Sequence, residues 1–125
     1  MLKILEVHPA RNAHGEYVVL QHCGLTTLCL RGWALSTDAF LDGDQQRLQK
    51  EMYIFKSDIA LQPYTKVVLF TGSGEDGWME TVDGRQAYCA YWDKAQSVWV
   101  GAGSIHLIHL LSSQRVISPA DSLSA

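Results

Sequence analysis

The sequence contains no cluster of basic residues and no long apolar run. Lysine and arginine number 10 against 13 aspartate and glutamate residues, so the formal net charge is −3. A domain that binds nucleic acid through its phosphates carries a basic patch or stripe, and none is visible here. No apolar stretch approaches the ~20 residues of a membrane-spanning helix, and Lys3 and Glu6 interrupt any signal-like start. These absences predict a cytoplasmic protein and argue against nucleic acid as the main partner.

Cysteine is scarce as well. Cys23, Cys29 and Cys89 are the only three, and no pair has the C-x-x-C spacing of a metal or redox motif. An odd count without a secretory signal favours reduced thiols. Apolar or small neighbours flank each cysteine, which predicts buried structural side chains. We therefore expect no metal and no cofactor.

The histidines and glycines near the chain's apolar segments do not combine into a recognisable catalytic or metal motif. His106 and His109 are three residues apart, and on a strand that spacing points them to opposite faces. One of the two should be a partly buried, hydrogen-bonded histidine. The acidic loop 38–44 lacks the ligand spacing of an EF-hand. Glu75 and Asp76 would repel a phosphate from the glycine loop at 72–77.

Short apolar runs separated by turn residues indicate an all-β protein. Strands are expected at residues 2–8, 16–23, 28–36, 52–55, 66–71, 86–92, 97–100, 104–111 and 114–118. Asp83 and Gly84 predict a hairpin turn. Residues 44–51 contain good helix formers but little apolar surface, so we expect a polar excursion with at most one helical turn. One domain should span residues 1–118, followed by a flexible polar tail over 119–125.

The third expected strand has an irregular apolar pattern. Leu30 has one strand parity, whereas Trp33 and Leu35 have the other. A one-residue bulge near Gly32 would turn both sets inward. The structural core is predicted to consist of Trp33, Gly32, Leu30, Leu35, Val18 and Leu20.

Several of these segments follow one order along the chain. An Ile-x-Glu-Val strand at 4–7 precedes a Glu-aromatic-Val-x-Leu strand at 16–20 and a Leu-x-Gly-Trp-x-Leu strand at 30–35. A Leu-x-Pro turn follows at 61–63, and a tryptophan with a glycine turn follows at 98–103. This series resembles the lamin tail domain family.

The resemblance implies an immunoglobulin-like β-sandwich of about eight or nine strands that serves in interaction or tethering rather than catalysis. Three positions depart from the family pattern. His22 stands in place of an asparagine, Ser104 in place of an acidic residue, and residues 112–114 in place of a hairpin glycine.

Trp78 is the best candidate for an exposed binding residue, together with its neighbours Met79 and Asp76. The alternative is that Trp78 folds back over the sheet edge. We therefore expect a non-catalytic module that binds a protein or a second copy of itself. A second hypothesis is a nucleic-acid or carbohydrate accessory module whose aromatic face contains Tyr88, Tyr91, Trp92 and Trp99. A third is a small hydrolase, although no nucleophile lies in a typical catalytic turn.

Overall fold

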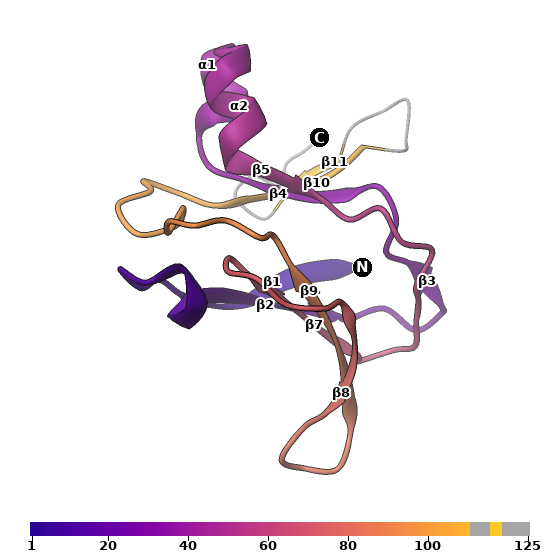
Figure 1. The fold of residues 1–125 in the computed structure, drawn as a ribbon. Helices are drawn as coiled ribbons and strands as arrows, with labels where there is room; N and C mark the ends of the chain where they lie inside the picture. Colours follow the sequence, from indigo (N-terminus) through magenta and orange to yellow (C-terminus); the bar gives the residue numbers. More distant parts are fainter. Residues whose placement is uncertain (111–115, 119–125) are drawn as a thin grey trace. The chain divides into compact units, whose positions relative to one another are not determined.

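The structure, a computed structural model, describes residues 1–110 and 116–118 and is rich in β-strands (Figure 1). Two compact units divide the chain, and each consists of two separate stretches of sequence. The first unit contains Met1–Leu28 and Leu61–Val100, and the second contains Cys29–Ala60 and the stretch that begins at Gly101. The expected all-β class is confirmed. Whether residues 1–118 behave as one domain stays a prediction, and the expected tail at 119–125 lies outside the described residues.

The first unit is built on a mixed five-stranded sheet in the order β1-β2-β7-β9-β8. Its strands are β1 (Leu2–His8), β2 (Tyr17–His22), β7 (Lys66–Phe70), β8 (Gly77–Glu80) and β9 (Gln86–Tyr91). All neighbouring pairs are antiparallel except β7 and β9, which are parallel. A short 3-10 helix, η1 (Ala13–Gly15), precedes β2, and the side chain of Asn12 caps it.

Apolar side chains occupy both faces of this sheet. Val18 and Leu20 on β2 share one face with Val67 and Leu69 on β7, and all four are fully buried. The same alternation places Tyr17 on the opposite face. Since parallel and central strands need apolar residues on both sides, this pattern agrees with the interior position of β2 and β7 in the sheet.

The second unit contains a four-stranded antiparallel sheet and two short helices. The strand order is β11-β10-β4-β5, where β4 spans Trp33–Ser36, β5 spans Met52–Ile54, β10 spans His106–His109 and β11 spans Val116–Ser118. The helices are α1 (Ala39–Asp42) and α2 (Gln45–Glu51). Two further two-residue strands, β3 (Leu28–Cys29) and β6 (Ala60–Leu61), lie where the chain passes from one unit to the other, and they pair with each other. The expected hairpin residues 112–114 lie outside the described part of the chain.

A turn, rather than the expected bulge, interrupts the strand predicted over residues 28–36. The Trp33 amide donates to the Leu30 carbonyl at 3.2 Å, which closes a four-residue turn. Gly32 has a φ of 89° at the third position of this turn, a conformation that glycine adopts without strain. Leu30, Trp33 and Leu35 are all buried. Because the turn separates Leu30 from β4, residues on its two sides can both face inward although their strand parities differ.

The predicted strand at 97–100 is wrong, and a buried carboxylate supplies the reason. Glu16, the residue immediately before β2, is completely buried. Its Oε1 accepts from the amides of Val98 at 2.8 Å and Trp99 at 3.1 Å, and its Oε2 accepts from Val100 at 3.1 Å. These amides therefore converge on one side chain instead of pairing with a neighbouring strand.

Two other contacts complete the environment of Glu16. The Thr71 hydroxyl donates to Oε1 at 2.7 Å, and the Ala10 amide donates to Oε2 at 3.3 Å. Burial alone would raise the pKa of Glu16, but the hydrogen bonds, with that from Val98 the largest, outweigh it and lower the pKa. Glu16 is thus a charged group satisfied almost entirely by backbone amides.

Residues 44–51 were also predicted incorrectly, because they form a helix of two turns. The Asp44 side chain caps α2 by accepting from the amides of Gln46 at 3.1 Å and Arg47 at 3.2 Å. Arg47 also pairs with Glu51 one turn later, at 3.1 Å. No residue of α2 is buried, so local capping and ion pairing take the place of an apolar face.

Candidate interaction surface

The edge strand β8 presents the largest apolar side chains on the sheet margin of the first unit. β9 is its neighbour on one side, and no strand in the described part of the chain pairs with its other side. Trp78 is 44% exposed and Met79 is 52% exposed. An unpaired edge with large apolar side chains is a typical place for another chain to add.

Both ends of β8 are fixed by aspartate side chains. At its beginning, Asp76 accepts a hydrogen bond from the Tyr91 amide at 2.9 Å. After its end, Asp83 accepts from the Thr81 hydroxyl and from the Arg85 amide at 3.2 Å, and these bonds, that from Thr81 first, lower the pKa of Asp83. The predicted hairpin turn is present, with Gly84 at a φ of 81°. Asp76, a predicted binding residue, therefore holds β8 in place.

The hydrogen-bond pattern of the hairpin decides which backbone groups point away from β9. The Thr81 amide donates to the Arg85 carbonyl at 2.7 Å, so this is a hydrogen-bonded pair. Antiparallel pairs alternate between hydrogen-bonded and non-hydrogen-bonded types. From the register of β8 with β9, Met79 and Gly77 turn their backbone groups toward β9. Trp78 and Glu80 turn theirs toward the open edge.

The two exposed side chains lie on opposite faces of the sheet. Trp78 is directly opposite Tyr88, and the two rings meet edge to face with centroids 5.5 Å apart. Met79 is opposite Ala87 on the other face. A strand added at this edge would therefore find an apolar neighbour on each face. The Trp78 ring contacts the buried Tyr88, as expected if it folds over the sheet edge, and is still exposed, as expected of a binding residue.

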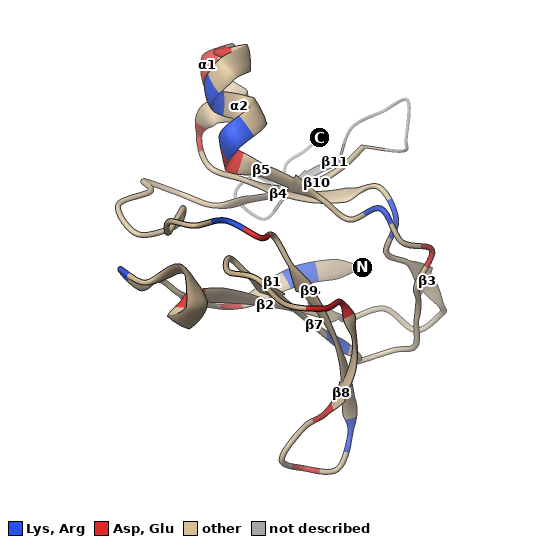
Figure 2. Ribbon diagram, in the orientation of Figure 1, with Lys and Arg blue, Asp and Glu red and all other residues tan. Residues whose placement is uncertain are grey.

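Acidic residues precede β8, end it and follow it along the chain (Figure 2). Residues 72–85 contain four acidic residues, Glu75, Asp76, Glu80 and Asp83, and one basic residue, Arg85. All five are exposed. The free edge thus has a negative surrounding.

The opposite edge of the same sheet is built differently. A register shift between Ile4 and Glu6 breaks the regular spacing of β1, and Leu5 at this irregularity is 44% exposed. Lys3 and Glu6 add charges of opposite sign. Bulges and charges are the usual devices that protect a sheet edge from unwanted pairing. β8 has no such register shift, so its backbone is the more regular of the two edges for an added strand.

A row of rings crosses one face of the sheet. His8, Tyr17, Phe70 and Tyr91 are cross-strand partners in successive strands. His8 stacks on Tyr17 with centroids 4.7 Å apart, and Phe70 stacks on Tyr91 at 4.9 Å. A Cβ added to Gly74 would come within 2.4 Å of the Tyr91 ring. Since most ring faces are occupied by neighbours, this row does not offer the flat platform on which sugars or bases stack.

The four aromatic residues expected to share a face are divided between different environments. Tyr88 and Trp99 are buried, Tyr91 belongs to the ring row, and Trp92 packs near Trp99 with centroids 5.5 Å apart. Lys94 lies 5.2 Å from the Trp92 ring centre. The predicted aromatic face is therefore not assembled as a single surface.

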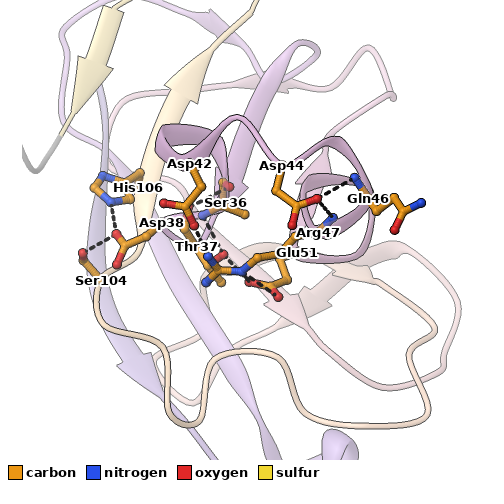
Figure 3. A network of polar contacts seen from close by, with 11 residues as sticks. Ser36, Thr37, Asp38, Asp42, Asp44, Gln46, Arg47, Glu51, Ser104 and His106 are labelled. Carbon is orange, nitrogen blue, oxygen red and sulfur yellow. Dashed lines mark hydrogen bonds and ion pairs between the residues drawn. The ribbon is translucent and has the colours of Figure 1, made fainter.

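In the second unit, Asp38 binds two side chains from the distant stretch of the chain (Figure 3). The Ser104 hydroxyl donates to Asp38 Oδ1 at 2.7 Å, and His106 Nε2 donates to the same oxygen at 2.8 Å. These bonds, that from Ser104 first, lower the pKa of Asp38. In a Ser-His-Asp triad the serine bonds to the histidine. Here Ser104 and His106 both donate to the carboxylate of Asp38, an arrangement that joins two separate stretches of the chain.

The expectation of a buried histidine on β10 is confirmed. His106 is 6% exposed, and its ring also meets Phe40 edge to face at 4.8 Å. His109 stacks on Trp33 with centroids 4.5 Å apart, and burial lowers its pKa. Within residues 1–110 and 116–118, no three His, Cys, Asp or Glu side chains are grouped so as to hold a metal ion.

The carboxylates of the acidic loop at 38–44 are directed to protein partners. Asp42 pairs with Arg47, Asp44 caps α2, and Arg47 continues to Glu51 (Figure 3). Glu51 also accepts from the Thr37 hydroxyl at 2.5 Å. These contacts hold α1 and α2 against the end of β4.

The three cysteines lie in different environments. Cys89 is buried, and burial raises the pKa of its thiol. Cys23 is half-buried, whereas Cys29 is exposed, so the prediction of a buried side chain is wrong for Cys29. All three are free thiols.

The strands expected from the sequence do not include Gly77–Glu80, so the position of Trp78 and Met79 on a strand was not predicted. The predicted hairpin turn at 82–85 was the available signal, because a hairpin turn needs a strand on each side. No described helix is both long and apolar enough to cross a membrane. No protein-family model matches this chain, and no curated protein is significantly similar to it in sequence.

Proposed function

We propose that this chain is a non-catalytic protein-binding module, and that the free edge of β8 with Trp78 and Met79 is its contact surface. The single observation that carries the proposal is the exposure of these two side chains on a sheet edge that no described strand covers. Tryptophan is among the residues that contribute most to binding when it becomes buried in a partner. The fixed hairpin presents both side chains at little cost in conformational entropy.

The proposal includes an immunoglobulin-like β-sandwich of the lamin tail type. Its support is the order of motifs along the sequence together with sheets of five and four strands. The buried positions of Glu16 and Trp33, which are part of the two most specific motifs, agree with structural roles for both. The three free cysteines support a cytoplasmic setting, where thiols stay reduced.

The test is quantitative cross-linking of the purified chain in an extract of its native host, with mass spectrometry of the captured proteins. We expect Trp78→Ala to reduce capture of specific partners at least about tenfold, as for a typical hot spot. Leu25→Ala is the matched control, because Leu25 is 84% exposed in the same unit and follows β2, which β7 and β9 separate from β8 in the sheet. Equal capture by wild type and Trp78→Ala would disprove the proposed surface.

Self-association through β8 is the less favourable form of this function. Antiparallel pairing of two copies about Trp78 places Asp76 opposite Glu80, at the two ends of the four-residue strand. Like charges directly opposite one another destabilise a strand pair. We therefore expect that Trp78→Ala does not change the molar mass that light scattering measures after size-exclusion chromatography.

A further inference from the structure

We propose that the free edge of β8 binds an extended segment of a partner protein in which lysine or arginine flanks apolar residues, and that this segment adds as a sixth strand. This inference rests on the proposed function and specifies the chemistry of the partner. It follows from the backbone, the side chains and the charge of the hairpin.

The backbone of β8 offers a short but regular ladder. Trp78 and Glu80 each direct one N–H and one C=O toward the open edge, as the alternation from the Thr81–Arg85 pair requires. An added strand can therefore form up to four main-chain hydrogen bonds. Because Asp76 and Asp83 fix both ends of β8, the ladder is already in the conformation that an added strand needs.

The side chains beside this ladder favour apolar residues at the centre of the partner segment. Trp78 covers one face and Met79 the other, so consecutive residues of the added strand would each meet an apolar neighbour. Cross-strand pairs with aromatic or large apolar residues stabilise a sheet. This requirement excludes a purely polar, basic tail as the best ligand.

The charge of the hairpin selects cations for the flanks. Four exposed carboxylates and one guanidinium lie within residues 72–85. An approaching segment with lysine or arginine on both sides of its apolar centre meets this negative surrounding, whereas an acidic segment is repelled. The same charges oppose the pairing of β8 with a second copy, which leaves a basic partner as the complementary occupant.

The experiment uses a synthetic probe and the full chain. The probe is an acetylated peptide of alternating Thr and Val with two Lys at each end. Its binding is followed by amide chemical shifts of the ¹⁵N-labelled protein. A peptide with Glu in place of Lys tests charge, and a peptide with Pro in place of the central Val tests strand addition. We expect the lysine peptide to bind at least about tenfold more tightly than either, and more weakly as salt is raised.

Protein variants separate the charge from the backbone. Glu80→Lys should weaken binding of the lysine peptide at least about fivefold, whereas Glu6→Lys, the same change on the opposite edge, should change it less than about twofold. Glu80→Pro removes an outward N–H and should abolish binding. Circular dichroism and the amide chemical shifts of β9 check that Glu80→Pro is folded. If Glu80→Pro does not fold, the result for Glu80→Lys still decides the test.

The outcomes distinguish this inference from the proposed function. Equal binding of the lysine and glutamate peptides overturns the charge requirement, and so does an equal effect of Glu6→Lys. Perturbed shifts away from β8 and β9 overturn the site. If no peptide binds while Trp78→Ala still loses its native partners, the inference fails and the proposed function stands. If Trp78→Ala also retains every partner, both fail.

Discussion

Each compact unit of the chain is assembled from two separate stretches of sequence, and in both units a carboxylate joins them. In the first unit, Glu16 on the early stretch accepts from backbone amides 82 to 84 residues later. In the second, Asp38 on the early stretch accepts from Ser104 and His106, 66 and 68 residues later. The chain therefore uses the same type of connection twice.

The two connections differ in burial and in the nature of their donors. Glu16 is fully buried and accepts from four backbone amides and one hydroxyl, whereas the Asp38 side chain is 36% exposed and accepts from two side chains. A buried carboxylate cannot be replaced by water, but an exposed one can. Glu16 therefore determines the backbone conformation of the residues that it binds, whereas Asp38 only stabilises the conformation of its partners.

Replacement of Glu16 should have the largest effect. In Glu16→Ala, the amides of Val98, Trp99 and Val100 lose their acceptor inside the protein. We expect the free energy of unfolding to fall by about 3–5 kcal/mol, and by about 2 kcal/mol in Glu16→Gln, which retains one oxygen. Urea denaturation measures both values.

Thr71→Val is the matched control for this prediction. It removes the one hydroxyl that Glu16 binds and leaves the backbone amides satisfied, so it should cost about 1 kcal/mol. A loss in Glu16→Ala no larger than that of Thr71→Val would show that the amides do not depend on the carboxylate.

Acid should distinguish the two carboxylates by the pH at which each loses its contribution. Both pKa values are lower in the folded protein, so each contribution is complete above the ordinary pKa, 4.5 for Glu16 and 3.8 for Asp38. Each is lost as the pH falls through the lower folded-state pKa. Urea midpoints between pH 6 and pH 2.5 should therefore decline for wild type. The decline of the urea midpoint with falling pH should be smaller in Glu16→Gln than in Asp38→Asn. An equal decline in both variants would contradict a larger contribution from Glu16.

The role of Glu16 also explains what could and could not be predicted from the sequence. β1 was predicted with its observed bounds, and the Asp83-Gly84 turn was correct, because local pattern and turn chemistry determine them. The Ser97–Val100 segment has the β-branched and aromatic residues of a strand, but its amides bind a side chain more than 80 residues away. No local pattern reports a contact of that range.

The remaining errors have local causes that the apolar pattern does not include. Asp44 and the Arg47–Glu51 pair stabilise α2 without an apolar face, so a prediction based on periodicity undervalues it. Gly32 was expected to form a bulge, and a turn achieves the same inward placement of Trp33. For the candidate surface, Trp78 and Met79 are exposed, and their role in binding stays a prediction. Their position on a strand required the pairing with β9.

Replacement of Asp38 should have a smaller and more local effect. In Asp38→Ala, Ser104 and His106 lose their shared acceptor, but Ser104 is exposed and can bind water instead. We expect a loss of stability less than about half of that in Glu16→Ala. Hydrogen exchange should show faster exchange at residues 104–109 and unchanged exchange at 98–100, and the opposite distribution in Glu16→Gln. Matching exchange patterns in the two variants would mean that the two connections are not independent.

The smallest effect concerns His109, which makes the second unit sensitive to mild acid. Burial against Trp33 lowers the pKa of His109, so the unfolded chain takes up a proton at higher pH than the folded one does. Its neutral form contributes fully above the ordinary pKa of 6.5, and this contribution is lost as the pH falls toward the folded-state value. Between pH 7.5 and 5.5, the protection factors of the amides at residues 106–109, which are corrected for the intrinsic pH dependence of exchange, should fall slightly in wild type and not in His109→Asn. The protection factors at 98–100 should not change, because Glu16 keeps its charge throughout this range. An equal fall at both sites, or one that persists in His109→Asn, would show that His109 is not the cause of a response to mild acid in the second unit.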